Sequence, residues 1–167
     1  VFGKPEDIPL AGDWDGNGFA KVGVYQISDS TFRLLAKNKT DGEITTVQFG
    51  MKGDIPVVGD WDGNHTATIG TYRPGDSTFR LRNSNSAGEP DISVRFGEKG
   101  DIPIAGKWTD NGPWTVGVYR PRDNTFLLRH TNTPGSPDES VVYGLAGDIP
   151  IAGDWDGNGT MTIGVFT

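Results

Sequence analysis

Apolar residues in this chain occur in short runs, separated by segments rich in glycine, proline, asparagine and aspartate. In "STFRLR", which starts at Ser77, Phe79 and Leu81 alternate with polar residues, as expected of a half-exposed β-strand. In "ISVRFG", Val94 and Phe96 fall on one face of an extended chain. No segment shows the three- to four-residue spacing of an amphipathic helix. The pattern therefore predicts an all-β protein made of short strands.

The strand-like segments recur at a constant interval of 47 residues. The string "DIPLAGDW" begins at Asp7, and related strings begin at Asp54, Asp101 and Asp148. The segments "TFRL", "TFRL" and "TFLL" keep the same interval. We therefore treat residues 1–167 as a single repeat array, with repeats 1–47, 48–94 and 95–141 and a partial repeat 142–167.

Each complete repeat contains four segments of this kind. In the second repeat they are "IPVVGDW", "TIGTY", "STFRLR" and "ISVRFG". Four strands in a period of about 40–50 residues are typical of a β-propeller blade. The prediction is an all-β fold of propeller-type, four-stranded blades, about three and a half of them in this chain. Because propellers close with about four to eight blades, we expect further repeats or other chains to complete the ring or array.

Two residue types that recur with the repeat predict how the blades pack. Tryptophan occurs once per repeat at one position, as Trp14, Trp61, Trp108 and Trp155. Such rings can form a stacking platform for sugars, but packing between blades is the interpretation that we favour, because aromatic rings dominate core energetics. The aspartate before each Ile-Pro is predicted to cap a turn. Arg73 and Arg120 are expected to pair with these aspartates at blade junctions.

The turn "GDWDGNG", which starts at Gly12, has the spacing of a calcium loop. Such loops place oxygen ligands at positions 1, 3 and 5, with a glycine at position 6. Three repeats offer two aspartates and an asparagine in this spacing, and these are the predicted metal ligands: Asp13, Asp15 and Asn17; Asp60, Asp62 and Asn64; Asp154, Asp156 and Asn158.

A second interpretation of the same turn needs no metal. Asn and Asp tolerate a positive φ and bond to their own backbone, so "DGN" is also a good hairpin turn. The third repeat reads "KWTDNG": Lys107 and Thr109 replace both aspartates, while Asn111 and Gly112 are kept. The turn therefore does not depend on the aspartates, and both interpretations stay open.

The segment "GDWDGNHTATIGTYRP", which starts at Gly59, resembles bacterial secreted repeats of the VCBS/FG-GAP class, whose hallmark is "GDWDGDGxxDIGVYRP". The likeness covers the whole chain and extends distantly to the propeller repeats of integrin α-subunits. The resemblance implies a calcium loop, but the family has an aspartate just before the second strand. This chain has Lys21, Thr68, Thr115 and Thr162 there. Any calcium is therefore expected to bind weakly, on the order of 10⁻⁴–10⁻³ M.

Composition narrows the classes of partner. Hydrophobic residues make up 34% of the chain, and the net charge is −7 with a pI near 4.7. An acidic chain without clustered Lys and Arg argues against nucleic-acid binding. No apolar run approaches the ~18 residues of a membrane span, so we expect no membrane insertion. The chain has no cysteine, and therefore no thiol chemistry.

The sequence offers little for catalysis. The two histidines, His65 and His130, occupy non-equivalent positions of the repeat, and no catalytic motif accompanies them. We therefore predict a non-enzymatic extracellular or surface module for adhesion, display or assembly, whose partners are other copies of itself, flanking repeats, glycans or surface proteins. The alternatives are a lectin-like glycan-binding propeller, assisted by calcium, and an accessory domain of a secreted hydrolase.

Overall fold

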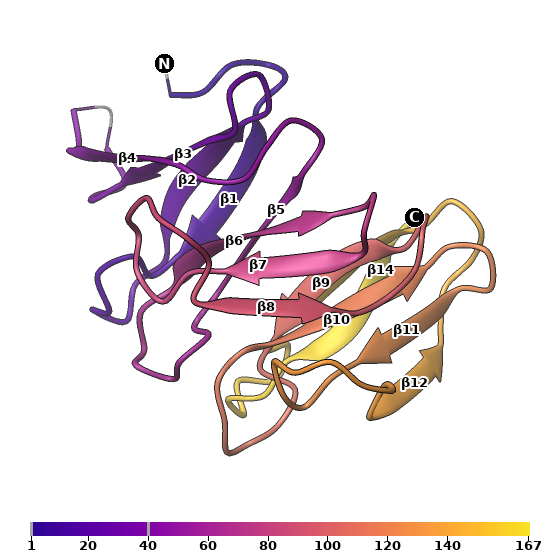
Figure 1. Ribbon diagram of the computed structural model, residues 1–167. Coiled ribbons are helices and arrows are strands. Elements are labelled where there is room, and N and C mark those ends of the chain that lie inside the picture. The colour runs from indigo at the N-terminus through magenta and orange to yellow at the C-terminus, as the bar shows by residue number, and fades with distance from the viewer. Residues whose placement is uncertain (1, 40) are drawn as a thin grey trace.

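The computed structural model describes residues 2–39 and 41–167, and within these ranges it contains 14 β-strands and no helix (Figure 1). The first sheet consists of β1 (Ile8–Gly12), β2 (Lys21–Gln26), β3 (Thr31–Leu35) and β4 (Ile44–Gln48). The second consists of β5 (Ile55–Gly59), β6 (Thr68–Arg73), β7 (Thr78–Leu81) and β8 (Ile92–Arg95). The third consists of β9 (Ile102–Gly106), β10 (Thr115–Arg120), β11 (Thr125–Leu128) and β12 (Glu139–Val142). The fourth has β13 (Ile149–Gly153) and β14 (Thr162–Phe166). No helix that could cross a membrane is present in the described part of the chain.

Every sheet is an antiparallel meander in which the strands pair in chain order. The register repeats as well as the order. Gly70 of β6 lies opposite Val57 and Leu81, and Gly117 of β10 lies opposite Ile104 and Leu128. The predicted all-β class and the strands of each 47-residue repeat are confirmed.

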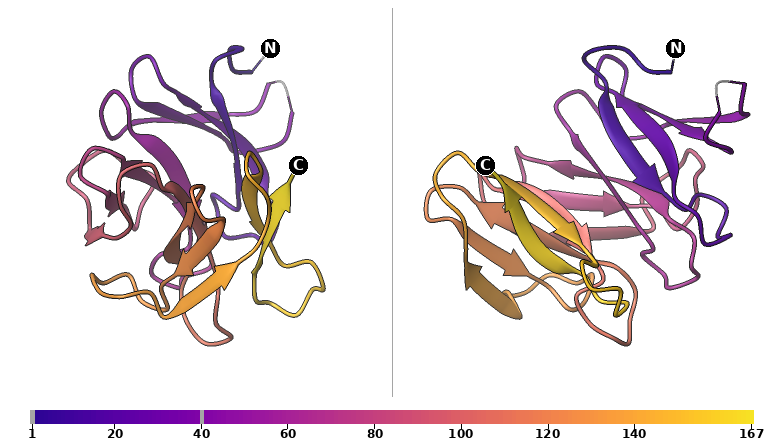
Figure 2. Two further views of the ribbon diagram at one scale, coloured as in Figure 1. Left: turned by 90° about the vertical axis from the view of Figure 1, so that its right-hand side faces the viewer. Right: turned by 180° about the vertical axis from the view of Figure 1, so that it is seen from behind.

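The sheets follow one another through their first strands. β1 contacts β5, β5 contacts β9, and β9 contacts β13. Figures 1 and 2 show the same succession, in which the four sheets lie in sequence order and are turned relative to one another. The turn after each first strand therefore lies close to the equivalent turn of the next sheet.

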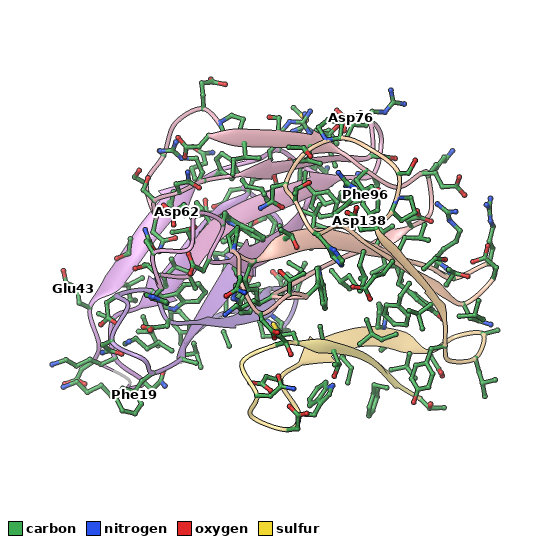
Figure 3. The ribbon with its side chains drawn as sticks, turned by 90° about the horizontal axis from the view of Figure 1, so that it is seen from below. Phe19, Glu43, Asp62, Asp76, Phe96 and Asp138 are labelled. Atoms are coloured by element: carbon green, nitrogen blue, oxygen red, sulfur yellow. The ribbon has the colours of Figure 1, made fainter. Side chains whose placement is uncertain are left out.

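The core lies between consecutive sheets. Within the second sheet, Tyr72 of β6 and Phe79 of β7 pack with their ring centroids 4.6 Å apart. Phe96, which follows β8, belongs to the same buried cluster as Val116 and Val118 of the third sheet (Figure 3). Aromatic side chains of one sheet are thus covered by aliphatic side chains of the next, and this burial is what holds neighbouring sheets together.

The repeated tryptophans serve packing. Trp61 and Trp108 are buried, and the indole nitrogen of Trp61 donates a hydrogen bond to the carbonyl of Ile69 at 3.3 Å. The Trp61 ring lies over Gly59, where an added Cβ would come within 2.8 Å of ring carbons. Trp61 also belongs to the buried cluster that contains Val116 of the third sheet, and Ile163 of the fourth sheet packs against the cluster of Trp108, so packing between neighbouring sheets is confirmed for these two rings. Trp155 of the fourth sheet is exposed.

The aspartates before Ile-Pro cap turns, as predicted. The Oδ2 atom of Asp54 accepts a hydrogen bond from the Met51 amide at 3.0 Å, and Arg73 donates two hydrogen bonds to the same carboxylate. Asp101 and Arg120 repeat this pairing. The predicted pairing of Arg73 and Arg120 with these aspartates is therefore confirmed, and both partners of each pair belong to one sheet. Antiparallel pairing puts the end of β6 beside the start of β5, so each pair lies within one sheet.

The close packing around the glycine of the second strand gives a stability test. An alanine Cβ at Gly70 would lie 2.8 Å from Cδ2 of Leu81 and 3.0 Å from Cγ2 of Val57. We expect Gly70→Ala to lower the free energy of unfolding by about 1–3 kcal/mol in urea denaturation, because the core must shift to accept the methyl group. Gly75→Ala is the matched control, since no atom lies within 4 Å of its added Cβ. Equal stability of the two variants would contradict this packing.

Candidate functional site

The acidic turn after β1 is held together by its own side chains. The Asp13 carboxylate accepts hydrogen bonds from the backbone amides of Asn17 at 3.1 Å and Gly18 at 2.6 Å. The Asn17 side-chain oxygen accepts a further bond from the Phe19 amide at 3.0 Å. The turns after β5 and β13 repeat this pattern through Asp60 and Asn64 and through Asp154 and Asn158. The aspartates therefore have a structural role in all three turns.

In the first turn, a lysine side chain lies where the predicted metal would bind. The ammonium of Lys21 is 2.5 Å from Oδ1 of Asp15, 2.9 Å from Oδ1 of Asn17 and 3.0 Å from the Phe19 carbonyl. It also lies 3.4 Å from Oδ1 of Asp13. These oxygens belong to positions 1, 3, 5 and 7, which are the ligand positions of a calcium loop. The protein itself thus supplies a cation at the centre of this turn.

The pKa shifts in the first turn agree with this ion cluster. The hydrogen bond to Asp15 raises the pKa of Lys21 and outweighs the opposing effect of desolvation. Desolvation raises the pKa of Asp13, but the hydrogen bonds from the Gly18 and Asn17 amides lower it, and the net pKa lies below its usual value. Both shifts favour the charged forms: Asp15 is the main partner that stabilises the Lys21 ammonium, and the amides of the turn are the main partners that stabilise the Asp13 carboxylate.

The second and fourth turns have no such lysine. Thr68 and Thr162 take its place, and the Thr68 hydroxyl donates to the Gly59 carbonyl instead. Asp60, Asp62 and Asn64 are brought together in one turn, and Asp154, Asp156 and Asn158 in the other. The Gly159 amide lowers the pKa of Asp154. Each turn contains two carboxylates, and no larger metal-ligating cluster of His, Cys, Asp and Glu occurs among residues 2–39 and 41–167. Metal binding in these turns stays a prediction.

In the first three turns, the residue at position 1 of the calcium-loop spacing links its sheet to the next through the backbone. The carbonyl of Asp13 accepts a hydrogen bond from the Ala67 amide, and that of Asp60 accepts one from Trp114, both at 2.8 Å. The Lys107 carbonyl accepts the equivalent bond from Met161 at 2.7 Å. Because the link uses the main chain, the third turn keeps it although lysine replaces aspartate.

A set of asparagines that the sequence reasoning missed holds the start of the second strand in the first three sheets. The Asn38 side chain accepts a hydrogen bond from the Val22 amide at 2.9 Å and donates one to the Ala20 carbonyl at 3.1 Å. Asn85 and Asn132 make the same two bonds in their repeats. The signal was present in the sequence, since these asparagines are 47 residues apart. They are structural, and they fasten the long loop before the fourth strand.

The polar loops between the third and fourth strands of the second and third sheets are filled by arginine side chains. The Arg129 guanidinium lies within its loop and donates to the carbonyls of Thr133 and Ser136 and to the Asp138 carboxylate. Arg82 makes equivalent bonds in the preceding repeat, to Ser86, Glu89 and Asp91. Many of the polar groups in these loops are therefore already bonded within the loop.

Comparisons with protein-family models, with curated proteins and with solved structures give no match. The geometry of the chain is therefore the basis on which its function is inferred below.

The ion cluster of the first turn predicts a pH-dependent loss of stability. Lys21→Thr gives this turn the residue of the other three repeats, and we expect a lower melting temperature at pH 7 with chelator present, because two carboxylates lose their cation. The pKa of Lys21 is raised, so its stabilisation is present below about pH 10.4 and is lost as the pH rises through the raised pKa. The pKa of Asp13 is lowered, so its stabilisation is present above about pH 3.9 and is lost as the pH falls through the lowered pKa.

The difference in melting temperature between native chain and variant should therefore be largest from about pH 5 to pH 9 and shrink at both extremes. Circular-dichroism melting measures it, with Lys52→Thr, a change at an exposed lysine, as the control. A difference that does not vary with pH would contradict an ionic role for Lys21.

Proposed function

We propose that this chain is a non-enzymatic, propeller-type repeat array that acts outside the cell in assembly and surface recognition. Three features support the proposal: the 47-residue repeat, the succession of four-stranded meanders, and the backbone link that joins each sheet to the next. The resemblance of "GDWDGNHTATIGTYRP" to VCBS/FG-GAP repeats favours a secreted or cell-surface location.

The observation that carries the assembly role is the apolar surface of the fourth sheet. Side chains that are buried in the third sheet are exposed at the same repeat position in the fourth. The exposed fraction is 39% for Ile151 against 8% for Ile104, 61% for Trp155 against 9% for Trp108, and 65% for Phe166 against 1% for Tyr119. Ile149 pairs with Phe166, and Ile151 lies two residues further along β13, so these exposed side chains share one face of the sheet. Apolar surface of this kind marks an interaction site.

The cause of this exposure indicates the kind of partner. Tyr119 packs against Phe126 of the neighbouring strand β11, whereas no third strand of the described chain pairs with β14 beside Phe166. The outer edge of β14 is therefore open to pairing with another strand. We propose that strands of the same repeat type cover this surface, supplied by flanking repeats or by another copy of the chain.

Assembly through the fourth sheet is tested by solution mass. We expect light scattering to give a mass that rises with concentration above the 18.0 kDa of one chain. Phe166→Asp should raise the concentration needed for association at least tenfold, because it places a charge on the apolar surface. Phe19→Asp is the control, since Phe19 is also largely exposed but lies at the tip of the first turn (Figure 3). A native chain that stays at 18.0 kDa at every concentration would contradict association between copies.

We also propose weak calcium binding in the second and fourth turns, where no ammonium lies among the ligand oxygens. With a dissociation constant on the order of 10⁻⁴–10⁻³ M, calcium at ten times that value should add about 1.4 kcal/mol of stability per site. We expect the melting temperature to rise with calcium, and the double variant Asp62→Asn, Asp156→Asn to abolish the rise.

The matched control for calcium is Asp15→Asn, which changes the equivalent carboxylate of the first turn. Because Lys21 already pairs with Asp15 there, this variant should lose stability but keep the full response to calcium. A calcium response that survives in the Asp62, Asp156 double variant would show that these turns do not bind the ion.

A further inference from the structure

A cavity of about 480 Å³ opens where the turns of the first three sheets meet. The ends of β1 and β5 form part of its wall, through Gly12 and Gly59. Asp13 and Asp60 contribute from the acidic turns, and Lys107 and Trp114 contribute from the third sheet. This volume lies within the ~300–1,000 Å³ of small-molecule sites.

Of the cavity-lining residues that depart from the repeat, three bring a charged or ring-bearing side chain, whereas the fourth, Val58, only replaces an alanine. The three are His65, Lys107 and Trp114, and they come from two different sheets. Their counterparts in the other repeats are Gly18, Gly112 and Gly159 for His65; Asp13, Asp60 and Asp154 for Lys107; and Ala20, Ala67 and Met161 for Trp114. The demands of a repeated fold do not account for these departures, and all three converge on one cavity.

His65 is kept in a conformation that suits glycine. Its φ is +69°, in the left-handed region, and the glycines at the same position in the first and fourth turns have φ values of +87° and +89°. A side chain in this region costs conformational energy, and such strain collects at functional sites. The imidazole at the cavity is thus present although glycine would form the turn at lower cost.

Trp114 gives the cavity a large apolar wall. It is half-buried, its amide is bonded to the Asp60 carbonyl, and its ring packs against Gly59. The residue at the equivalent position between the first and second sheets is Ala67, which also lines the cavity. Ala67 is small and Trp114 is large, so the space in the cavity is bounded by an aromatic ring on the side of Trp114.

Lys107 gives the cavity a positive charge without a partner. Lys21 pairs with Asp13 and Asp15, whereas the half-buried Lys107 pairs with no carboxylate in the part of the chain that the structure describes. Asp13 and Asp60 accept bonds from the amides of their own turns, and each carboxylate oxygen can accept a further bond from a hydroxyl group.

We infer that this cavity binds one unit of an acidic sugar, a pyranose ring that carries a carboxylate. The apolar face of the ring would pack against Trp114, the carboxylate would pair with Lys107, and the ring hydroxyls would donate to Asp13 and Asp60. A doubly charged phosphate ester fits less well, because two carboxylates line the same cavity. The inference goes beyond the assembly function and is independent of it, since the cavity is built by the first three sheets alone.

The test is a titration of the chain with methyl glucuronide and with methyl glucoside, followed by calorimetry and ligand-observed NMR. We expect the glucuronide to bind at least tenfold more tightly than the neutral glucoside. Lys107→Asp should weaken glucuronide binding at least tenfold and leave the glucoside affinity within twofold. Trp114→Met should weaken the binding of both sugars. Both substitutions introduce the residue of another repeat, so the fold should tolerate them, and circular dichroism checks this.

Two controls sharpen the test. Lys99→Met removes an exposed lysine that does not line the cavity, and Trp155→Ala removes an exposed tryptophan of the fourth sheet; neither should change sugar binding. The titration is repeated with Phe166→Asp, whose sugar affinity should equal that of the native chain, so that failure of assembly and failure of sugar binding are distinguished. No binding of the glucuronide to the native chain, or equal affinity for both sugars, would overturn the inference.

Discussion

The hydrogen bond that joins each sheet to the next, at the turn after the first strand, fixes how that turn lies against the second strand of the following sheet. The carbonyls of Asp13, Asp60 and Lys107 accept it from the residue that precedes the second strand of the following sheet. The link therefore uses the main chain of the same turn that carries the acidic side chains. The side chain takes no part in the link, so aspartate and lysine both occur at this position. The charge of the turn can therefore change while the hydrogen bond between the sheets is kept.

Repulsion between converging oxygens is offset in two different ways in the acidic turns. Side-chain and carbonyl oxygens converge in each turn, and converging oxygens repel one another unless a cation or a hydrogen-bond donor lies among them. In the first turn the Lys21 ammonium fills this role, and because it is part of the chain it is always present. In the second and fourth turns, the amides of the turn bind the carboxylates and no ammonium does. We regard only these two as places where an external ion would add stability.

Burial in this molecule comes from neighbours rather than from one central core. Each sheet covers part of the sheet before it, and Phe96 is buried because Val116 and Val118 of the next sheet lie against it. In such an array, stability is close to a sum of terms from individual sheets and from their interfaces. The fourth sheet therefore has apolar residues at the same repeat positions as the third sheet but buries them less, and its apolar surface is where assembly would add most burial.

Alternating residues and turn chemistry predicted the strands, the repeat, the packing of Trp61 and the acidic turns, because these depend on neighbours in the chain. The asparagines at 38, 85 and 132 also recur at the 47-residue interval, and this recurrence could have predicted their structural role. Only the tertiary structure decided that Lys21 occupies its own turn, that Arg73 pairs within a sheet, and that His65, Lys107 and Trp114 meet at one cavity. Residues so far apart in the chain meet through the turning of successive sheets, which the local pattern does not encode.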